Sequence, residues 1–199
     1  MAKKHINSDR TNLDNAAVCM AETDPKSQCE KIESFLCRVF CCADKNPFLR
    51  KDGLYKQSCA DKLLTALRTI SNGGDSKEFG KHGKNANISY YNSLSYTMTP
   101  SEEERREHKT KEYSYANING RLKKYKIRTP DVSIYDENMN LIDIYDFKFD
   151  GDKWREGQKE DYTRLLSNKK EPETIDKNRC NNCDILNNKK IFLQKKKQR

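Results

Sequence analysis

The sequence predicts a mixed α/β domain of the α+β kind, with a central mixed sheet of about four strands flanked by helices. Three observations indicate it: an apolar helical period in the first half of the chain, two short β-rich runs joined by a turn-rich linker, and a second helical period after them. The predicted order along the chain is helix, strand, strand, strand, helix, strand (αβββαβ). No internal repeat is visible.

The first predicted helix covers residues 57–70. Its apolar residues recur at helical spacing, and an asparagine followed by two glycines supplies the stop signal at residues 72–74. Residues 88–98 are rich in aromatic and β-favouring side chains and are predicted as the first strand. After this strand, Thr99 is placed as an N-cap and Pro100 as the first residue of a short, charged helix or loop.

A β-hairpin is predicted next. Its strands cover residues 131–135 and 141–149, and the five-residue linker between them is rich in turn-favouring side chains. A second helix is predicted over residues 155–166, and residues 172–176 are predicted as the last strand. The hairpin and the helix that follows it carry most of the candidate functional residues.

Charge and composition limit the packed part of the chain. Of the 199 residues, 34% are hydrophobic and 35% are charged, and the net charge is +9. Residues 1–55 are therefore predicted as a flexible, cysteine-bearing lead-in, residues 56–185 as the folded domain and residues 186–199 as a basic tail. The positive charge indicates an anionic partner, since clustered Lys and Arg release counterions from phosphates. A solvated tail that keeps the protein soluble explains the terminal charges equally well.

No stretch approaches the roughly 18 apolar residues of a membrane span, and the first residues lack the apolar core of a signal peptide, so we expect a soluble protein without a membrane partner.

The chain contains eight cysteines. Without a leader, reduced and partly buried thiols are the expected state. Cys180 and Cys183 form a CxxC, which is half the spacing of a zinc site. A structural Zn²⁺ at cysteines and a set of disulfides are the alternatives.

Two aspartates and a lysine around the hairpin suit metal-dependent phosphodiester hydrolysis. Asp131 opens the first strand of the hairpin, and Asp146 and Lys148 share one face of the second strand. Oxygen ligands favour Mg²⁺ or Mn²⁺, so Asp131, Asp146 and the main-chain carbonyl of Phe147 are the predicted metal ligands. Lys148 would orient or help deprotonate the attacking water and stabilise charge on the phosphate. A surface salt bridge between Asp146 and Lys148 is the rival interpretation.

The second helix adds side chains beside this set. Gln158 and Tyr162 are four residues apart and therefore share a helix face. Lys153 and Arg155 are candidate contacts to backbone phosphates, although an exposed pair before a helix is equally common. Trp154, between them, is interpreted as a core residue and not as a base-stacking group.

Pro130-Asp131, Asp146-Phe147-Lys148 and the Gln158-x-x-x-Tyr162 spacing together resemble the PD-(D/E)XK nuclease superfamily, and more closely its VRR-NUC branch. The stretch from Phe147 to Gln158 looks like the version in bacterial type VI secretion effectors, which are toxins that degrade DNA. The resemblance implies a restriction-endonuclease-like core, catalytic roles for Gln158 and Tyr162 beside Asp131, Asp146 and Lys148, and a further acid on the first helix. Asp61 and Glu78 are the candidates for that acid.

The activity implied is that of a Mg²⁺-dependent endodeoxyribonuclease that hydrolyses double-stranded DNA. The resemblance further implies an antibacterial toxin made in the bacterial cytoplasm, delivered by a type VI secretion component, active in the target-cell cytoplasm and inhibited by a cognate immunity protein. Two alternatives are kept. One is a housekeeping or phage repair nuclease of the same branch, and the other is a zinc-containing, basic nucleic-acid-binding module in which the carboxylates have no catalytic role.

Overall fold

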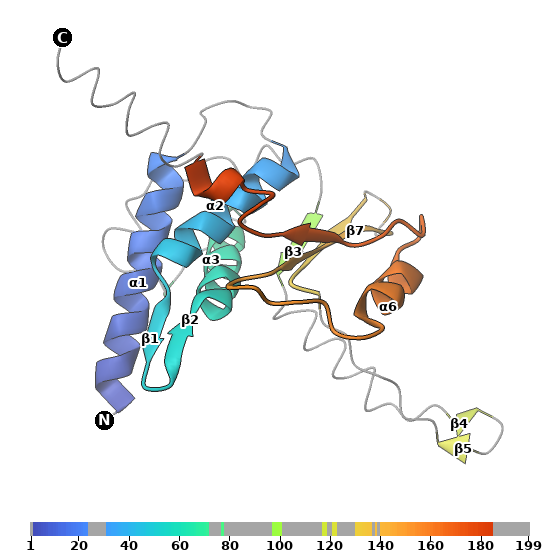
Figure 1. Ribbon diagram of the computed structural model, residues 1–199, viewed down its shortest axis with the longest axis horizontal. Coiled ribbons are helices and arrows are strands. Elements are labelled where there is room, and N and C mark those ends of the chain that lie inside the picture. Colours follow the sequence, from blue (N-terminus) through green and yellow to red (C-terminus); the bar gives the residue numbers. More distant parts are fainter. Residues whose placement is uncertain are drawn as a thin grey trace, which may run out of the picture. The chain divides into compact units, whose positions relative to one another are not determined.

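The computed structural model describes residues 2–23, 31–71, 77, 97–100, 117–118, 121–122, 130–136, 138 and 140–184. These residues combine helices and strands, which confirms the α+β class (Figure 1). They divide into two compact units. The first takes the described residues within 1–95, 147–152 and 174–199, and the second takes those within 96–146 and 153–173.

None of the described helices is long and apolar enough to cross a membrane.

Three helices and a short hairpin make up most of the first unit (Figure 1). The bounds are α1 (Ala2–Glu22), α2 (Ile32–Lys45), α3 (Lys56–Ser71), β1 (Phe48–Arg50) and β2 (Gly53–Tyr55). Every residue of α2 from Phe35 to Ala43 is buried, so this helix is surrounded by protein. Helix α3 confirms the helix predicted over residues 57–70.

Helix α1 lies where a flexible lead-in was expected. Its buried residues Leu13, Ala16, Ala17 and Met20 follow the helical spacing i, i+3, i+4, i+7. Two of the four are alanines, whose small side chains give a weak hydrophobic signal in the sequence. The buried Arg38 of α2 donates hydrogen bonds to the main-chain carbonyl of Met20 and to the Thr23 hydroxyl, which supplies partners at the end of α1 where helical carbonyls lack them.

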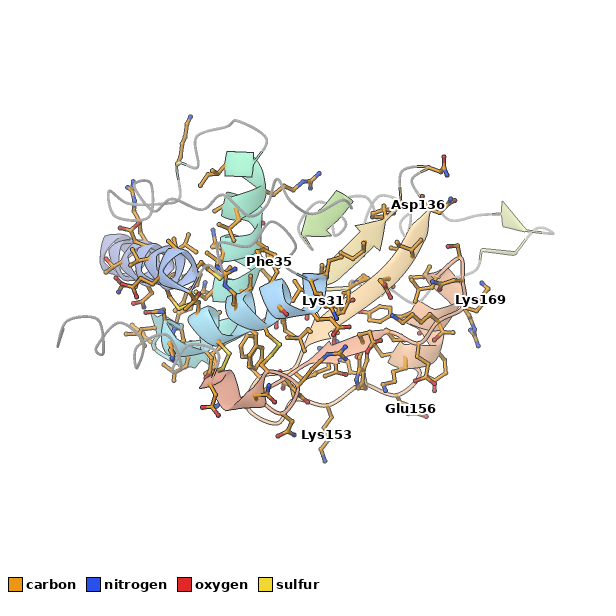
Figure 2. The ribbon with its side chains drawn as sticks, turned by 90° about the horizontal axis from the view of Figure 1, so that it is seen from above. Lys31, Phe35, Asp136, Lys153, Glu156 and Lys169 are labelled. Atoms are coloured by element: carbon orange, nitrogen blue, oxygen red, sulfur yellow. A yellow bond between two sulfur atoms is a disulfide. The ribbon has the colours of Figure 1, made fainter. Side chains whose placement is uncertain are left out.

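Three disulfides hold the first unit together. They join Cys19 to Cys42, Cys37 to Cys180 and Cys41 to Cys183, and Figure 2 draws disulfides as yellow bonds. The expectation of reduced thiols is therefore wrong for these six residues, and the disulfide alternative holds. Cys59 in α3 is a buried free thiol, and burial raises its pKa to about 12.

The segment that follows β7 is fixed against α2 by aromatic stacking. The Phe40 ring of α2 stacks on the Phe149 ring with centroids 4.3 Å apart, and lies 6.3 Å from the Phe147 ring. Lys56 at the start of α3 adds ion pairs of 2.6 Å to Asp44 and 2.6 Å to Asp150. Phe147, the last residue of β7, and Phe149 thus pack into the core of the first unit.

The second unit is built on a sheet and one helix. The strands are β3 (Thr97–Pro100), β4 (Asn117–Ile118), β5 (Arg121–Leu122), β6 (Val132–Tyr135) and β7 (Leu141–Phe147), and the helix is α6 (Gln158–Leu165). The sheet order is β3-β6-β7-β8, where β8 is Glu173–Ile175, and the β3–β6 and β6–β7 pairs are antiparallel. Strands β4 and β5 form a separate antiparallel pair. The predicted hairpin is confirmed as β6 and β7.

Asp136 closes the β6–β7 hairpin. Its carboxylate accepts hydrogen bonds from the main-chain N–H groups of Asn138 and Asn140 and from the Asn140 amide, at 2.8–3.0 Å. These bonds hold the pKa of Asp136 below its usual value. The side chain therefore fixes the turn, and with it the register of the two strands.

The structure corrects the expectation for Thr99 and Pro100. Both lie in β3 and pair with Ser133 and Val132 of β6, and neither begins a helix. Strand β3 is at the edge of the sheet, where the missing N–H of a proline leaves no ladder bond unmade. Of the strand predicted over residues 88–98, only Thr97 and Met98 are described. The rest of that strand and the basic tail lie outside the described residues.

We expect Lys56→Met to lower the free energy of unfolding by about 1–3 kcal/mol, between the values for exposed and buried ion pairs. The substitution removes the cation bound to Asp150 and the nearer cation of Asp44, which keeps Lys177 at 3.5 Å. Burial alone would lower the pKa of Lys56, but hydrogen bonds to Asp150 and Asp44 outweigh it and raise that pKa. The stabilisation that the Lys56 ion pairs give the folded protein is therefore complete below a pH of 10.5, the ordinary lysine pKa. It is lost as the pH rises through the raised pKa of Lys56.

Urea unfolding of wild type and Lys56→Met at pH 8 and above pH 11 measures this difference. The exposed Lys51, in the turn between β1 and β2, provides the control variant Lys51→Met, which should change stability at neither pH. A difference between wild type and Lys56→Met that stays constant with pH would contradict the assignment.

Candidate active site

The β6–β7 hairpin brings two aspartates opposite each other. Val132 pairs with Tyr145 and Ser133 with Ile144 in an antiparallel register. Continuing that register by one residue places Asp131 opposite Asp146, and directly opposed residues project to the same side with Cβ atoms about 4.5–5.5 Å apart. The residue just before β6, Asp131, is therefore level with Asp146 near the end of β7 in the continued register.

Asp146 is buried and Asp131 is half-buried. Only 3% of Asp146 is exposed. A carboxylate this far from water needs hydrogen-bond partners or a nearby cation to remain ionised. The surroundings of Asp146 therefore determine what the site can do.

Gln158 provides one such partner. Its Nε2 donates to Asp146 Oδ2 at 3.5 Å, at the long limit for a hydrogen bond, and to the Tyr162 hydroxyl at 3.2 Å. Its Oε1 accepts from the main-chain N–H of Arg155 at 3.0 Å. With its oxygen committed to Arg155, the amide presents its N–H groups to Asp146. The structure thus brings together Asp146, Gln158 and Tyr162.

Helix α6 is seated on β7 by an apolar cluster. Ile144, Tyr162 and Leu166 are each 1% exposed or less, and the partly buried Leu141 and Trp154 pack against them. The Trp154 ring meets the Tyr162 ring edge-on at 5.9 Å. Trp154 is therefore a packing residue, as predicted, and the cluster fixes the part of α6 that carries the Gln158 amide.

A tight backbone turn precedes α6. The N-cap residue of α6 is Gly157. Its φ of +69° is a backbone conformation that residues other than glycine rarely adopt. Helix α6 begins at Gln158, three residues later than the sequence indicated. The turn allows the Gln158 amide to accept from the main chain of Arg155.

Lys148 lies two residues beyond Asp146. Its main-chain N–H donates to the carbonyl of Ile175 at 2.9 Å, so the backbone stays extended past the end of β7. Phe147 and Phe149 on either side pack against Phe40, which turns Lys148 away from α2. The Lys148 side chain is half-buried.

The oxygen atoms at the end of the hairpin suit a small divalent cation. Two carboxylates and the Phe147 main-chain carbonyl are hard ligands, and Mg²⁺ ordinarily takes one or two carboxylates and completes its octahedron with water and phosphate oxygens. With the cysteines joined in disulfides, no group of three or more His, Cys, Asp or Glu side chains in the described ranges is placed to hold a metal ion. A Mg²⁺ or Mn²⁺ ion at Asp131 and Asp146 would therefore depend on water and substrate for its remaining ligands.

The two predicted phosphate contacts lie just before α6. Lys153 and Arg155 are both exposed, and Figure 2 shows the Lys153 side chain extending away from the ribbon. On α6 the Lys159 ammonium lies 5.4 Å from the centre of the Trp154 ring, which orients a third cation in the same stretch.

Of the two candidates for a further acid, Asp61 is described. It lies on α3, is 5% exposed and accepts a hydrogen bond of 3.0 Å from Gln57. Asp61 belongs to the first unit, whereas Asp131 and Asp146 belong to the second. Glu78 lies outside the described residues.

The long-range cysteine pairs are the main feature that sequence reasoning missed. Cys37 and Cys41 are four residues apart on α2, and their partners Cys180 and Cys183 are three apart. This matched spacing is a signal that two disulfides could form side by side. It is a weak one, because six cysteines alone allow 15 pairings.

No known protein family, curated protein or solved structure matches this chain.

We expect the Tyr162 ring to stabilise the protein and its hydroxyl to contribute little. Tyr162→Ala should lower the free energy of unfolding by about 3–5 kcal/mol through loss of buried packing. Tyr162→Phe should lower it by only about 0.5–1.5 kcal/mol, because it removes one neutral hydrogen bond to Gln158. Chemical unfolding monitored by Trp154 fluorescence measures both.

Leu165→Ala is the matched control on the same helix, since Leu165 is 44% exposed. It should change stability by less than about 1 kcal/mol. If Tyr162→Ala lowered the free energy of unfolding no more than Leu165→Ala does, the packing of α6 against β7 through Tyr162 would be contradicted.

Proposed function

We propose that this protein is a Mg²⁺-dependent endonuclease that hydrolyses phosphodiester bonds in double-stranded DNA. One observation carries the proposal: the Gln158 amide of α6, which also bonds to Tyr162, contacts the buried Asp146, and Asp131 directly precedes Val132, which pairs with Tyr145. A surface salt bridge would need neither the opposed aspartate nor the glutamine. The burial of Asp146 also favours a site over a solvated charge.

The proposed fold is a restriction-endonuclease-like core. The described elements α3, β3, β6, β7, α6 and β8 follow the order helix, three strands, helix, strand, with β4 and β5 between β3 and β6. The sheet order β3-β6-β7-β8 is compatible with that core. The resemblance to the PD-(D/E)XK superfamily and its VRR-NUC branch supports the same assignment.

Each residue has a role in the proposed mechanism. Asp131, Asp146 and the Phe147 carbonyl would hold Mg²⁺ or Mn²⁺, which when bound lowers the pKa of a water molecule and offsets charge on the scissile phosphate. Gln158 holds Asp146 in a fixed orientation, and Tyr162 in turn holds Gln158. Lys148 would place its ammonium beside the phosphate, where it orients the attacking water and stabilises the developing negative charge.

Lys153 and Arg155 would bind the DNA backbone. Both are exposed and flank Trp154 just before α6. Contacts of this kind position a duplex without reading its sequence. The described residues offer no free helix suited to the major groove, so cleavage with little sequence preference is the expected behaviour.

We further propose that the nuclease acts as an antibacterial toxin. The resemblance of residues 147–158 to type VI secretion effectors supports this, and it implies synthesis in the bacterial cytoplasm, a type VI delivery component and a cognate immunity protein in the producing cell. The target would be DNA in the recipient cytoplasm. An acidic inhibitor surface is expected, because the residues proposed to contact DNA are basic.

Plasmid cleavage tests the activity. Supercoiled DNA incubated with the protein and Mg²⁺ should be nicked and linearised, and EDTA should prevent this. Asp146→Asn and Lys148→Ala should each reduce the rate at least ~100-fold, as expected for groups that stabilise a transition state. Asp143→Asn is the matched control: Asp143 is on the same strand three residues earlier, on the opposite face, and pairs with Lys170 at 2.8 Å.

Intact plasmid with a folded protein under Mg²⁺ and Mn²⁺, or equal rates in Asp146→Asn and wild type, would contradict the nuclease assignment. Expression in a bacterial host tests the toxin role separately. Wild type should halt growth and degrade the chromosome, whereas Asp146→Asn should be tolerated. A protein that cleaves plasmid but is harmless when expressed would instead be a repair nuclease.

A further inference from the structure

A cluster of four cysteines in the first unit lies apart from the proposed catalytic residues. Cys37 and Cys41 share one face of α2, since they are four residues apart. Cys180 directly precedes the short 3₁₀ helix η2 (Asn181–Cys183), and Cys183 is its last residue. All four side chains are at most 5% exposed. In the structure they are joined as two adjacent disulfides, Cys37–Cys180 and Cys41–Cys183.

We propose that these four residues form a structural zinc site when the protein is reduced, so that the disulfides and a zinc ion are alternative states of one cluster. The sequence contains a CxxC that lacks a second ligand pair, and α2 supplies it. A pair of cysteines one helical turn apart and a CxxC turn together give the four thiolates of a closed structural site.

The geometry requires only small movements. Cα atoms across the two disulfides are 5.2 and 5.5 Å apart, and residues four apart on a helix have Cβ atoms about 5–6 Å apart. A tetrahedral site with Zn–S bonds of about 2.3 Å has its sulfurs about 3.8 Å from one another. Each bonded pair of sulfurs would open by about 1.7 Å, a movement that side-chain rotation can supply.

The backbone around the CxxC already forms a tight turn. The Cys183 N–H donates to the Cys180 carbonyl at 2.9 Å, and the Cys180 N–H donates to the Asp176 carbonyl at 3.0 Å. Asn181 and Cys183 have φ of +49° and +64°, which holds the two cysteines on one side of the turn.

The remaining described cysteines are separate from this cluster. Cys42 lies next to Cys41 on α2 but points to α1, where it pairs with Cys19. Cys59 is buried, and the raised pKa of about 12 keeps it a thiol. Both provide controls within the same unit.

Electrons and protons balance in the change from two disulfides to a zinc tetrathiolate. Each disulfide takes two electrons and two protons from a dithiol reductant and yields two thiols. The four thiols then release four protons as they bind one Zn²⁺, which gives a tetrathiolate with a net charge of −2. Oxidation returns both disulfides and expels the metal. The proposal does not depend on the nuclease activity.

Zinc and cobalt binding to the full chain tests it. Protein reduced with an excess of a metal-free reductant, passed through a desalting column without oxygen, should take up about one zinc per chain, whereas the oxidised protein should take up none. Co²⁺ in place of zinc should give the visible bands of a tetrahedral site and the near-ultraviolet bands of cobalt–thiolate bonds. Cys41→Ser and Cys183→Ser should lose this binding, and Cys59→Ser and Cys42→Ser should retain it.

Reduced wild type that binds neither metal would overturn the proposal, as would zinc binding that survives in Cys41→Ser and Cys183→Ser. The cobalt spectrum of wild type decides the question even if those variants do not fold, because the strength of its thiolate bands reports how many sulfurs bind. Zinc already present in protein isolated with free thiols at these positions would support the site directly.

Discussion

The connection between α2 and the CxxC turn is the constraint on which the first unit depends. The disulfides Cys37–Cys180 and Cys41–Cys183 span 143 and 142 residues. Closing one loop of this length removes chain entropy worth about 5 kcal/mol from the unfolded state. The second bond adds far less, because once the first has formed only a few residues separate the remaining pair. Its role is to fix the orientation of the CxxC turn against α2, which a single bond would leave free to rotate.

The second unit depends on packing and register more than on covalent bonds. Asp136 sets the turn, and a β-bulge at Ile134 and Tyr135 then shifts the register by one residue, so that Val132 pairs with Tyr145. The hydrophobic cluster of Ile144, Tyr162 and Leu166 then packs α6 against β7, so that the Gln158 amide reaches Asp146. A buried carboxylate is stable only among such partners. The same chain of contacts therefore supports both the local fold and the geometry proposed for catalysis.

The parts of the fold that the sequence predicted are those with strong local signals. Helix α3 has a clear leucine period, and the β6–β7 hairpin has a turn-rich linker between two β-rich runs. Helix α1 was missed because its buried face contains two alanines, and Thr99-Pro100 was misplaced because pairing with β6 outweighs a local capping pattern. In the site, the sequence predicted that Asp131 and Asp146 lie on paired strands, but it did not predict the β-bulge at Ile134 and Tyr135, which shifts the register by one residue. The disulfides between α2 and the CxxC turn could not be predicted from the sequence, since no local pattern selects partners more than 140 residues away.

The first unit is discontinuous along the chain, and this has a consequence for biosynthesis. Helices α1 to α3 leave the ribosome long before residues 147–152 and 174–183, which complete their core. At about 5–20 residues per second, the delay between Cys37 and Cys180 is roughly 7–30 s. During that interval the five cysteines between residues 19 and 42 are present together, and two of them, Cys37 and Cys41, lack their final partners. In an oxidising compartment, cotranslational folding would favour incorrect pairs, so the native arrangement depends on late oxidation or on an isomerase.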